Sequence, residues 1–169
     1  MLEKHRKVSA KSVNCTIITV SDTRTEENDK SGQLIKKLLT EQGHVISDYT
    51  IVHDEQDEIN RALEKATEDS GVAAVILNGG TGIAKRDVTI EVVQSSLDKE
   101  IPGFGELFRM LSYQKDIGSA ALLSRAIAGV INNTAVFSIP GSSGAVRLAM
   151  NDLILPELGH IVMEVEKDN

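Results

Sequence analysis

Residues 72–82 read Val-Ala-Ala-Val-Ile-Leu-Asn-Gly-Gly-Thr-Gly, and they pass from the most apolar run of the chain into a turn with three glycines in four positions. The apolar run predicts a buried β-strand. Glycines let the backbone approach a ligand closely and turn its N–H groups outward. The stretch therefore predicts a strand that ends in a ligand-binding turn, with a flexible strand-to-helix connection as the alternative.

Strand and helix patterns alternate on both sides of this stretch. Apolar or β-branched runs predict further strands at residues 15–20, 44–52 and 134–139, of which 44–52 is the most polar and belongs near a sheet edge. Helices are predicted around residues 34–39, 59–66, 87–97, 106–113 and 119–128, and from Gly144 onward with a bend near Pro156. This alternation indicates an α/β layer fold with a largely parallel sheet and right-handed crossovers.

The composition is that of an ordinary globular protein: of 169 residues, 41% are hydrophobic and 25% charged. We expect one domain over residues 14–169 behind a polar, basic arm of residues 1–13. No apolar run approaches the roughly 18 residues of a membrane span, and the basic N-terminus lacks the apolar core of a secretory signal. The single cysteine, Cys15, excludes an intrachain disulfide and fits the reducing cytoplasm, where we expect the protein to be.

The charges are divided unevenly along the chain. Lysines and arginines number 18 and aspartates and glutamates 25, for a net charge of −7. The arm carries +3, so the rest of the chain carries −10. An acidic body with 3% aromatic residues and no tryptophan lacks both the basic field and the stacking surfaces of a nucleic-acid-binding protein. An anionic small ligand is compatible with this charge, because charges beyond about 8 Å are largely screened.

Ligands of such sheets bind beyond the carboxyl ends of the strands, so the segments that follow the strands form the candidate site. These segments contain Ser21, Asp22, Asp54, Gly79, Gly80, Thr81, Gly82, Gly141, Ser142 and Ser143. Lys85 and Arg86 follow the glycine turn and precede a predicted helix start, where they could neutralise a bound phosphate. The turn matches neither the dinucleotide fingerprint nor the P-loop, which disfavours a hydride-transfer enzyme and a P-loop NTPase.

The aspartates of this site have two possible roles. Asp54 and Asp87 are a candidate pair of Mg²⁺ ligands beside a phosphate site, because Mg²⁺ prefers carboxylate oxygens. Helix N-caps also favour aspartate, and both residues precede predicted helices. Asp22, after the first strand, has the same ambiguity. The four histidines show no metal-ligand spacing.

The serines of the later segments also have a structural alternative. Ser142 or Ser143 either offers a donor to a ligand or caps the helix that follows. Ser124 and Arg125 lie in the predicted helical segment 119–128. Together they could reach a ligand, or Arg125 could pair with a carboxylate.

Seven short motifs occur in register along the chain. They are Thr19-Val-Ser-Asp-Thr, Asp54-Glu, Asn78-Gly-Gly-Thr-Gly, Arg86-Asp-Val-Thr, Ile101-Pro-Gly-Phe, Leu123-Ser-Arg-Ala with Ala128-Gly, and Pro140-Gly-Ser. From about Val13 to near the C-terminus, the chain closely resembles the MoaB/MogA family of molybdenum cofactor biosynthesis proteins, and it looks most like the MoaB branch. The resemblance implies the molybdopterin-binding MogA/MoaB-like fold, with three α/β/α layers around a mostly parallel sheet, and a homotrimer or homohexamer.

The resemblance also implies a ligand and a reaction. Members of the family bind molybdopterin, a pterin with a dithiolene and a terminal phosphate, and the adenylyltransferase members transfer AMP from Mg-ATP to that phosphate. By motif matching, Asp54 and Asp87 fall on the family's essential carboxylates and Ser124 on a substrate-contacting serine. Residues 79–82 and 141–143 fall on its ligand loops. Two carboxylates can hold Mg²⁺ on the triphosphate, and no covalent protein nucleophile is required.

Two activities stay open within this resemblance. The first is a molybdopterin adenylyltransferase with Mg-ATP as co-substrate, which the presence of both Asp54 and Asp87 favours. The second is a molybdopterin-binding or carrier protein of the same pathway that transfers no nucleotide. Asn78 stands where many relatives carry Thr, and Ser143 where many carry Pro, but neither change removes a proposed catalytic group.

The segment from residue 101 to 131 holds more apolar side chains than two short helices need within their own domain. These side chains are Phe104, Leu107, Phe108, Met110, Leu111, Leu122 and Leu123. We expect a subunit interface to bury some of them, and closed symmetry is the usual outcome. The basic arm could lie across the acidic body of a neighbouring subunit.

Overall fold

The computed structural model describes residues 12–169, so the first eleven residues of the predicted arm lie outside the described part. The sequence predicts Ser12 and Val13 as part of the arm, but both belong to the folded part. Val13 is 2% exposed and donates its backbone N–H to Nδ1 of His44 at 3.1 Å. Ser12 Oγ donates to the carbonyl of Gly43 at 3.0 Å.

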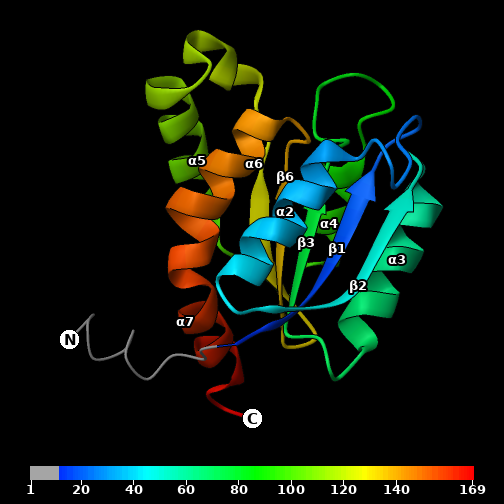
Figure 1. The fold of residues 1–169 in the computed structure, drawn as a ribbon, viewed down its shortest axis with the longest axis vertical. Coiled ribbons are helices and arrows are strands. Elements are labelled where there is room, and N and C mark those ends of the chain that lie inside the picture. Colours follow the sequence, from blue (N-terminus) through cyan, green and yellow to red (C-terminus); the bar gives the residue numbers. More distant parts are fainter. Residues whose placement is uncertain (1–11) are drawn as a thin grey trace.

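A six-stranded sheet lies at the centre of the fold, in the order β2-β1-β3-β6-β5-β4 (Figure 1). Its strands are β1 (Asn14–Val20), β2 (Val45–Val52), β3 (Ala74–Asn78), β4 (Lys99–Glu100), β5 (Ile127–Ile131) and β6 (Thr134–Ile139). The first four in the spatial order run parallel, whereas β5 is antiparallel to both β6 and β4. The four predicted strands and the edge position of the second are confirmed.

Helices cover both faces of this sheet, which confirms the three-layer α/β/α fold (Figure 1). One face is covered by α2 (Lys30–Glu41), α5 (Pro102–Lys115), α6 (Ser143–Ala149) and α7 (Leu155–Glu166), and the other by α3 (Gln56–Glu68) and α4 (Thr89–Ser96). The central strands supply both cores, because successive side chains of a strand point to opposite faces. Ile76 of β3 lies in the first core and Leu77 in the second.

The predicted helix over 119–128 is wrong. A 3₁₀ helix, η1 (Gly118–Leu123), covers only the first part of this range, and residues 127–131 form β5, a hairpin partner of β6. The turn of this hairpin is Asn132-Asn133, and both residues have positive φ angles, of 47° and 63°. Asparagine tolerates this conformation, which two-residue hairpin turns require.

The other differences from the predicted helices are at their ends. The helix predicted at 106–113 extends from Pro102 to Lys115, and the one predicted from Asp87 begins at Thr89. The predicted bend near Pro156 is confirmed: a π-helical turn, η2 (Met150–Ile154), separates α6 from α7. Proline has no N–H to continue the regular helical hydrogen bonds, so the wider turn precedes it.

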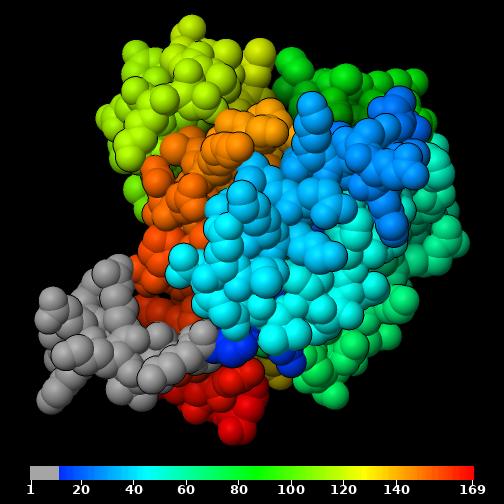
Figure 2. Space-filling view, in the orientation of Figure 1, coloured from blue at the N-terminus to red at the C-terminus, as the bar shows by residue number. Residues whose placement is uncertain are grey.

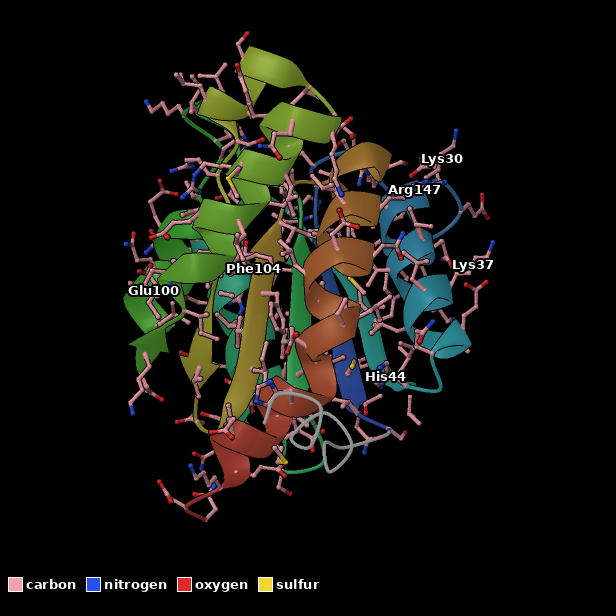
Figure 3. All side chains as sticks on the ribbon, turned by 90° about the vertical axis from the view of Figure 1, so that its left-hand side faces the viewer. Lys30, Lys37, His44, Glu100, Phe104 and Arg147 are labelled. Atoms are coloured by element: carbon pink, nitrogen blue, oxygen red, sulfur yellow. The ribbon has the colours of Figure 1, made fainter. Side chains whose placement is uncertain are left out.

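The apolar residues of segment 101–131 divide between the core and the surface. Phe104, which is labelled in Figure 3, and Phe108 lie in the core. Phe104 packs edge-on against Phe137 of β6, with ring centroids 5.5 Å apart. The two phenylalanines therefore do not contribute to surplus apolar surface. Large exposed side chains on α5, η1 and the turn between them are Leu107, Met110, Tyr113, Ile117, Leu122 and Leu123. Figure 2 shows the end of α5 and η1 at one upper corner of the molecule.

No helix within residues 12–169 is both long and apolar enough to cross a membrane.

Candidate functional site

The segments that follow β1, β2, β3 and β6 meet at the carboxyl end of the sheet and line an open cavity of about 380 Å³. Its lining residues are Val20, Ser21, Thr23, Arg24, Asp54, Gly79, Gly80, Thr81, Gly82, Asp87 and Gly141. The structure thus brings most of the predicted ligand-binding residues and both predicted catalytic aspartates into one space. Asp22, Lys85, Arg86, Ser124, Ser142 and Ser143 do not line it.

The glycine turn after β3 has a conformation that requires glycine at two positions. Gly79 and Gly80 have positive φ angles, of 97° and 66°. A Cβ on Gly79 would collide with the carbonyl oxygen of Val20, because the turn passes closely over the end of β1. The N–H of Gly79 is bonded to the carbonyl of Ile139 in β6 at 3.0 Å. The turn is therefore fixed between the ends of two other strands.

Neither Asp54 nor Asp87 caps a helix. Helix α3 begins at Gln56 with Glu55 in the N-cap position, and α4 begins at Thr89 with Val88 in that position; neither cap residue makes a side-chain cap bond. Asp87 instead accepts the N–H of Ala84 at 3.1 Å, within its own loop. The helix-cap explanation of these two aspartates is therefore wrong, and their placement in the cavity calls for another role.

The two carboxylates lie directly against the glycine turn. Asp54 Oδ1 is 2.9 Å from the position that a Cβ on Gly80 would occupy, and Asp87 Oδ2 is 2.6 Å from the corresponding position on Gly82. Burial raises the pKa of Asp54 above its ordinary value, and the negative charges of Asp22 and Asp87 raise it further. Three carboxylates thus repel one another at this end of the sheet, which is a setting that favours a bound cation.

The oxygen donors at this point are of the kind that Mg²⁺ prefers when it is held jointly with a phosphate ligand. The hydroxyl of Thr89 is fully buried and has no hydrogen-bond partner within residues 12–169, and it too would collide with a Cβ on Gly80. It therefore lies beside Asp54, so hard oxygen atoms cluster around the turn. Mg²⁺ is commonly bound by one or two carboxylates together with substrate phosphates. Residues 12–169 contain no group of three or more His, Cys, Asp or Glu residues that could hold a metal.

Arg86 is tied to carboxylates instead of facing the cavity. Its Nε and Nη2 lie 2.8 and 3.0 Å from the two carboxylate oxygens of Asp22, and Nη2 is also 3.0 Å from Glu55 Oε1. The bonds from Arg86, and the N–H of Asp54, lower the pKa of Asp22. Lys85 is exposed and lies outside the lining. The geometry gives no support to the prediction that these two side chains neutralise a phosphate.

Arg125 binds the backbone of the glycine turn without lining the cavity. Its guanidinium donates to the carbonyls of Thr81 at 3.0 Å, Gly82 at 2.7 Å and Asp87 at 3.3 Å, and it also pairs with Glu91 of α4. This pairing lowers the pKa of Glu91. The predicted pairing of Arg125 with a carboxylate is confirmed, but its bonds to three backbone carbonyls could not be seen in the sequence.

The serines have mainly local roles in the structure. Ser142 Oγ accepts the N–H of Ala145 at 3.2 Å and caps α6, which confirms the structural alternative for that residue. Ser143 is the first residue of α6 and is exposed, and Ser124 ends η1. Ser21 lines the cavity, and its Oγ accepts the N–H of Arg24 at 3.1 Å.

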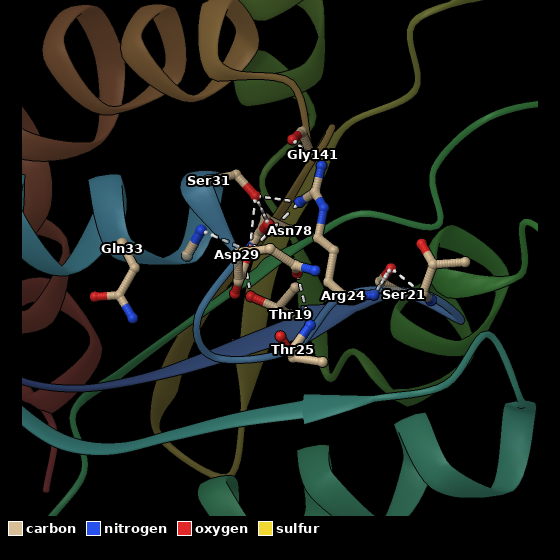
Figure 4. A network of polar contacts seen from close by, with 12 residues as sticks. Thr19, Ser21, Arg24, Thr25, Asp29, Ser31, Gln33, Asn78 and Gly141 are labelled. Carbon is tan, nitrogen blue, oxygen red and sulfur yellow. Dashed lines mark hydrogen bonds and ion pairs between the residues drawn. The ribbon is translucent and has the colours of Figure 1, made fainter.

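Sequence reasoning missed a buried polar network beside the cavity (Figure 4). Its centre is Asp29, which caps α2 by accepting the N–H of Gly32 at 3.1 Å and whose side chain is fully buried. Burial alone would raise the pKa of Asp29, but hydrogen bonds from Thr19, Tyr49, Gly32 and Ser31 outweigh it and lower the pKa. Asp29 directly before an amphipathic helix was the available signal, since aspartate is a preferred N-cap.

Asn78 connects this network to the glycine turn. Its side-chain N–H donates to Thr19 Oγ1 at 2.9 Å, and its Oδ1 accepts from Ser31 Oγ at 2.6 Å. Asn78 is the last residue of β3 and is fully buried. Asn78 is therefore a structural link between β1, α2 and the turn.

A larger hollow, of about 720 Å³, lies at the opposite, amino end of the sheet beside Asn132 and Asn133. The converging glycine turns and paired aspartates are all at the carboxyl end, so volume alone does not identify the site.

The cysteine and two histidines of the described residues take no part in the site. Cys15 is buried, and burial raises its pKa to about 12, which agrees with an inert thiol. His53 bonds Glu58 and His44 accepts from Val13, so neither is directed into the cavity.

Comparisons with known proteins agree on one family. Residues 16–160 match the family described as "Probable molybdopterin binding domain". Over 167 residues, 57% are identical to "Molybdenum cofactor biosynthesis protein B" of Halalkalibacterium halodurans, and the match covers 99% of this chain and 98% of that protein.

Solved structures agree as well. The "Crystal structure of Molybdenum cofactor biosynthesis protein B" superposes with a TM-score of 0.91 and 62% identity, over 93% of this chain and 98% of that chain. The "tungsten cofactor synthesizing protein MoaB from Pyrococcus furiosus" gives a TM-score of 0.84 and 40% identity, over 93% of this chain and 99% of that chain.

Proposed function

The chain belongs to the family of probable molybdopterin binding domains, and on that premise we propose that it acts in molybdenum cofactor biosynthesis by binding molybdopterin and transferring AMP from Mg-ATP to its terminal phosphate. The family membership confirms the resemblance to MoaB/MogA proteins drawn from the sequence motifs. The observation that carries the proposal is the position of Asp54 and Asp87. Both carboxylates lie against a glycine turn in one cavity, and neither caps a helix.

The proposed reaction joins two anions. An oxygen of the pterin's terminal phosphate attacks the α-phosphorus of ATP, a new P–O bond forms, and the bond to the β-phosphate breaks so that pyrophosphate leaves. A magnesium ion, when bound, supplies positive charge to the triphosphate and its leaving group. In this chain, Asp54 and Asp87 would hold that ion. The turns at residues 79–82 and at Gly141 would place backbone N–H groups near the phosphates and keep them in line.

Arg125 would contribute by fixing the turn. The backbone N–H groups of a glycine-rich turn bind an anion only if they keep a common orientation. Arg125 binds the carbonyls of Thr81 and Gly82, which constrains the peptide planes that carry neighbouring N–H groups. Arg125 does not line the cavity, so we assign it the role of a positioning residue.

We also propose that the protein assembles as a homotrimer or a homohexamer. Leu122 is 85% exposed and Leu123 is 51% exposed. Both belong to η1, which packs against α5, and α5 also carries the exposed Leu107 and Met110. Large apolar side chains exposed on two adjoining elements favour burial against another subunit.

The test is a reaction of the purified protein with molybdopterin and Mg-ATP, followed by chromatography and mass detection of the pterin. The proposal predicts a pterin that carries AMP, together with pyrophosphate. Asp87→Asn should abolish the product, whereas Asp168→Asn, which removes an exposed carboxylate elsewhere, should not. Retention of molybdopterin without AMP transfer would identify the carrier function instead. Failure to retain the pterin would overturn both functions.

A further inference from the structure

Arg24 is the only cationic side chain among the residues that line the cavity. It comes from the segment after β1, and 32% of its side chain is exposed. A phosphate ligand in this cavity meets the carboxylates of Asp54 and Asp87, so it needs a positive group within reach. Arg86, which follows the glycine turn in sequence, is already occupied by Asp22 and Glu55.

Three partners hold the guanidinium of Arg24 in place (Figure 4). Nη1 pairs with Asp29 at 3.5 Å and donates to Ser31 Oγ, and Nη2 donates to the carbonyl of Gly141 at 3.0 Å. A guanidinium has five N–H groups. Two of these groups, the Nε–H and the second N–H of Nη2, have no acceptor within residues 12–169. An anchored arginine with unused donors is already organised for a ligand, so binding restricts little additional motion.

The position of the guanidinium joins the two glycine turns. Nη1 of Arg24 lies 3.3 Å from the position that a Cβ on Gly141 would occupy, and the Cα of Gly79 lies equally close to that position. Any side chain at residue 141 would therefore crowd both the arginine and the other turn. Because residues 79 and 141 are glycines, no side chain stands between the two turns and the guanidinium of Arg24. All three residues line the cavity.

The cavity is thus polarised. Asp54 and Asp87 face one part of the glycine turn, whereas Arg24 lies at the junction of Gly79 and Gly141. An anion is attracted to the arginine part and a divalent cation to the carboxylate part. A bound Mg-phosphate ligand can satisfy both parts at once, with its phosphate oxygens toward Arg24.

We propose that Arg24 binds a phosphate group of the substrate through its two unused N–H groups, and that it is the phosphate-binding cation of this site. The role that the sequence suggested for Lys85 and Arg86 is thereby assigned to Arg24. The proposal rests on the proposed function in taking the ligand to be a phosphate ester or anhydride. The competing role for Arg24 is neutralisation of the buried Asp29 alone.

Pyrophosphate is the probe that separates these roles, because it is a phosphate anhydride and requires no turnover. Calorimetric titration of the purified full chain should show binding. Arg24→Lys keeps a positive charge beside Asp29 but loses the planar fork, and it should weaken pyrophosphate binding at least about tenfold, the equivalent of one hydrogen bond to a charged group. Arg24→Gln should weaken it further. Lys37→Gln, which removes an exposed charge on α2, should change it little.

A second measurement uses the unaltered protein and so does not depend on whether a variant folds. The Nε–H resonance of Arg24 in a nitrogen-15 spectrum should shift on addition of pyrophosphate. Binding without such a shift, equal binding by Arg24→Lys and the unaltered protein, or no binding at all would each overturn the proposal. If Arg24 responds to pyrophosphate while no AMP reaches molybdopterin, the adenylyl-transfer function fails and the assignment of Arg24 stands.

Discussion

Replacing Arg125 with alanine tests whether this side chain fixes the glycine turn. The substitution removes bonds to the carbonyls of Thr81, Gly82 and Asp87 and the ion pair with Glu91. Each such bond is worth about 0.5–1.5 kcal/mol net, and Arg125 is 30% exposed, so we expect a total loss of about 2–3 kcal/mol in unfolding free energy. For a chain of this length, that loss lowers Tm by about 5–10 °C.

Thermal denaturation followed by circular dichroism measures this loss directly. Arg125→Lys should recover only part of it, because an ammonium cannot reproduce the planar fork that spans several carbonyls. Arg61→Ala, at an exposed arginine on α3, is the matched control and should melt close to the unaltered protein. Pyrophosphate binding by Arg125→Ala should fall as well, since the turn would lose its fixed orientation. A Tm within about 1–2 °C of the unaltered protein, the range of an ordinary surface substitution, would show that Arg125 does not fix the turn.

Three further predictions concern the carboxylates and the assembly. Asp87→Asn should lower adenylyl transfer at least about 100-fold with Tm nearly unchanged, because Asp87 caps no helix and asparagine can still accept from Ala84; normal turnover would reject the metal-holding role. Asp54→Asn should raise Tm at neutral pH, because the raised pKa of Asp54 means that its ionised form opposes folding. That gain should vanish as the pH falls below the ordinary aspartate pKa of about 3.9, and a variant less stable at neutral pH would contradict it. Light scattering should give three or six times the mass of the chain, and deletion of residues 1–11 should favour the smaller form; the deletion stops there because Val13 is buried. A monomer would contradict the proposed assembly.

The sequence predicted those features that depend on neighbouring residues. The strand at 72–77 and its glycine turn carry their own signals, namely apolar continuity and residues that tolerate positive φ. The same holds for the helix cap at Ser142. The helix predicted over 119–128 is wrong because the signal of a hairpin, Asn132-Asn133, lies after the apolar run, which by itself is compatible with a helix or a strand.

The parts of the site that could not be predicted depend on distant residues. Arg86 meets Asp22, which is 64 positions away, and Arg24 meets Gly141, which is 117 positions away. A pattern of neighbouring residues in the sequence does not predict which charged side chains will pair with each other and which will face the ligand. The sequence therefore suggested Arg86 but not Arg24 as a ligand-facing cation, whereas Asp54 and Asp87 were placed correctly at the carboxyl end of the sheet.

The most direct test of the account is a crystal structure of the protein grown with molybdopterin, Mg²⁺ and the α,β-methylene analogue of ATP, which cannot release pyrophosphate. The account predicts the triphosphate between the turn at residues 79–82 and Gly141, a metal at Asp54 and Asp87, and the pterin phosphate beside the α-phosphate. Ligand density at the amino end of the sheet, with this cavity holding neither nucleotide nor pterin, would contradict it.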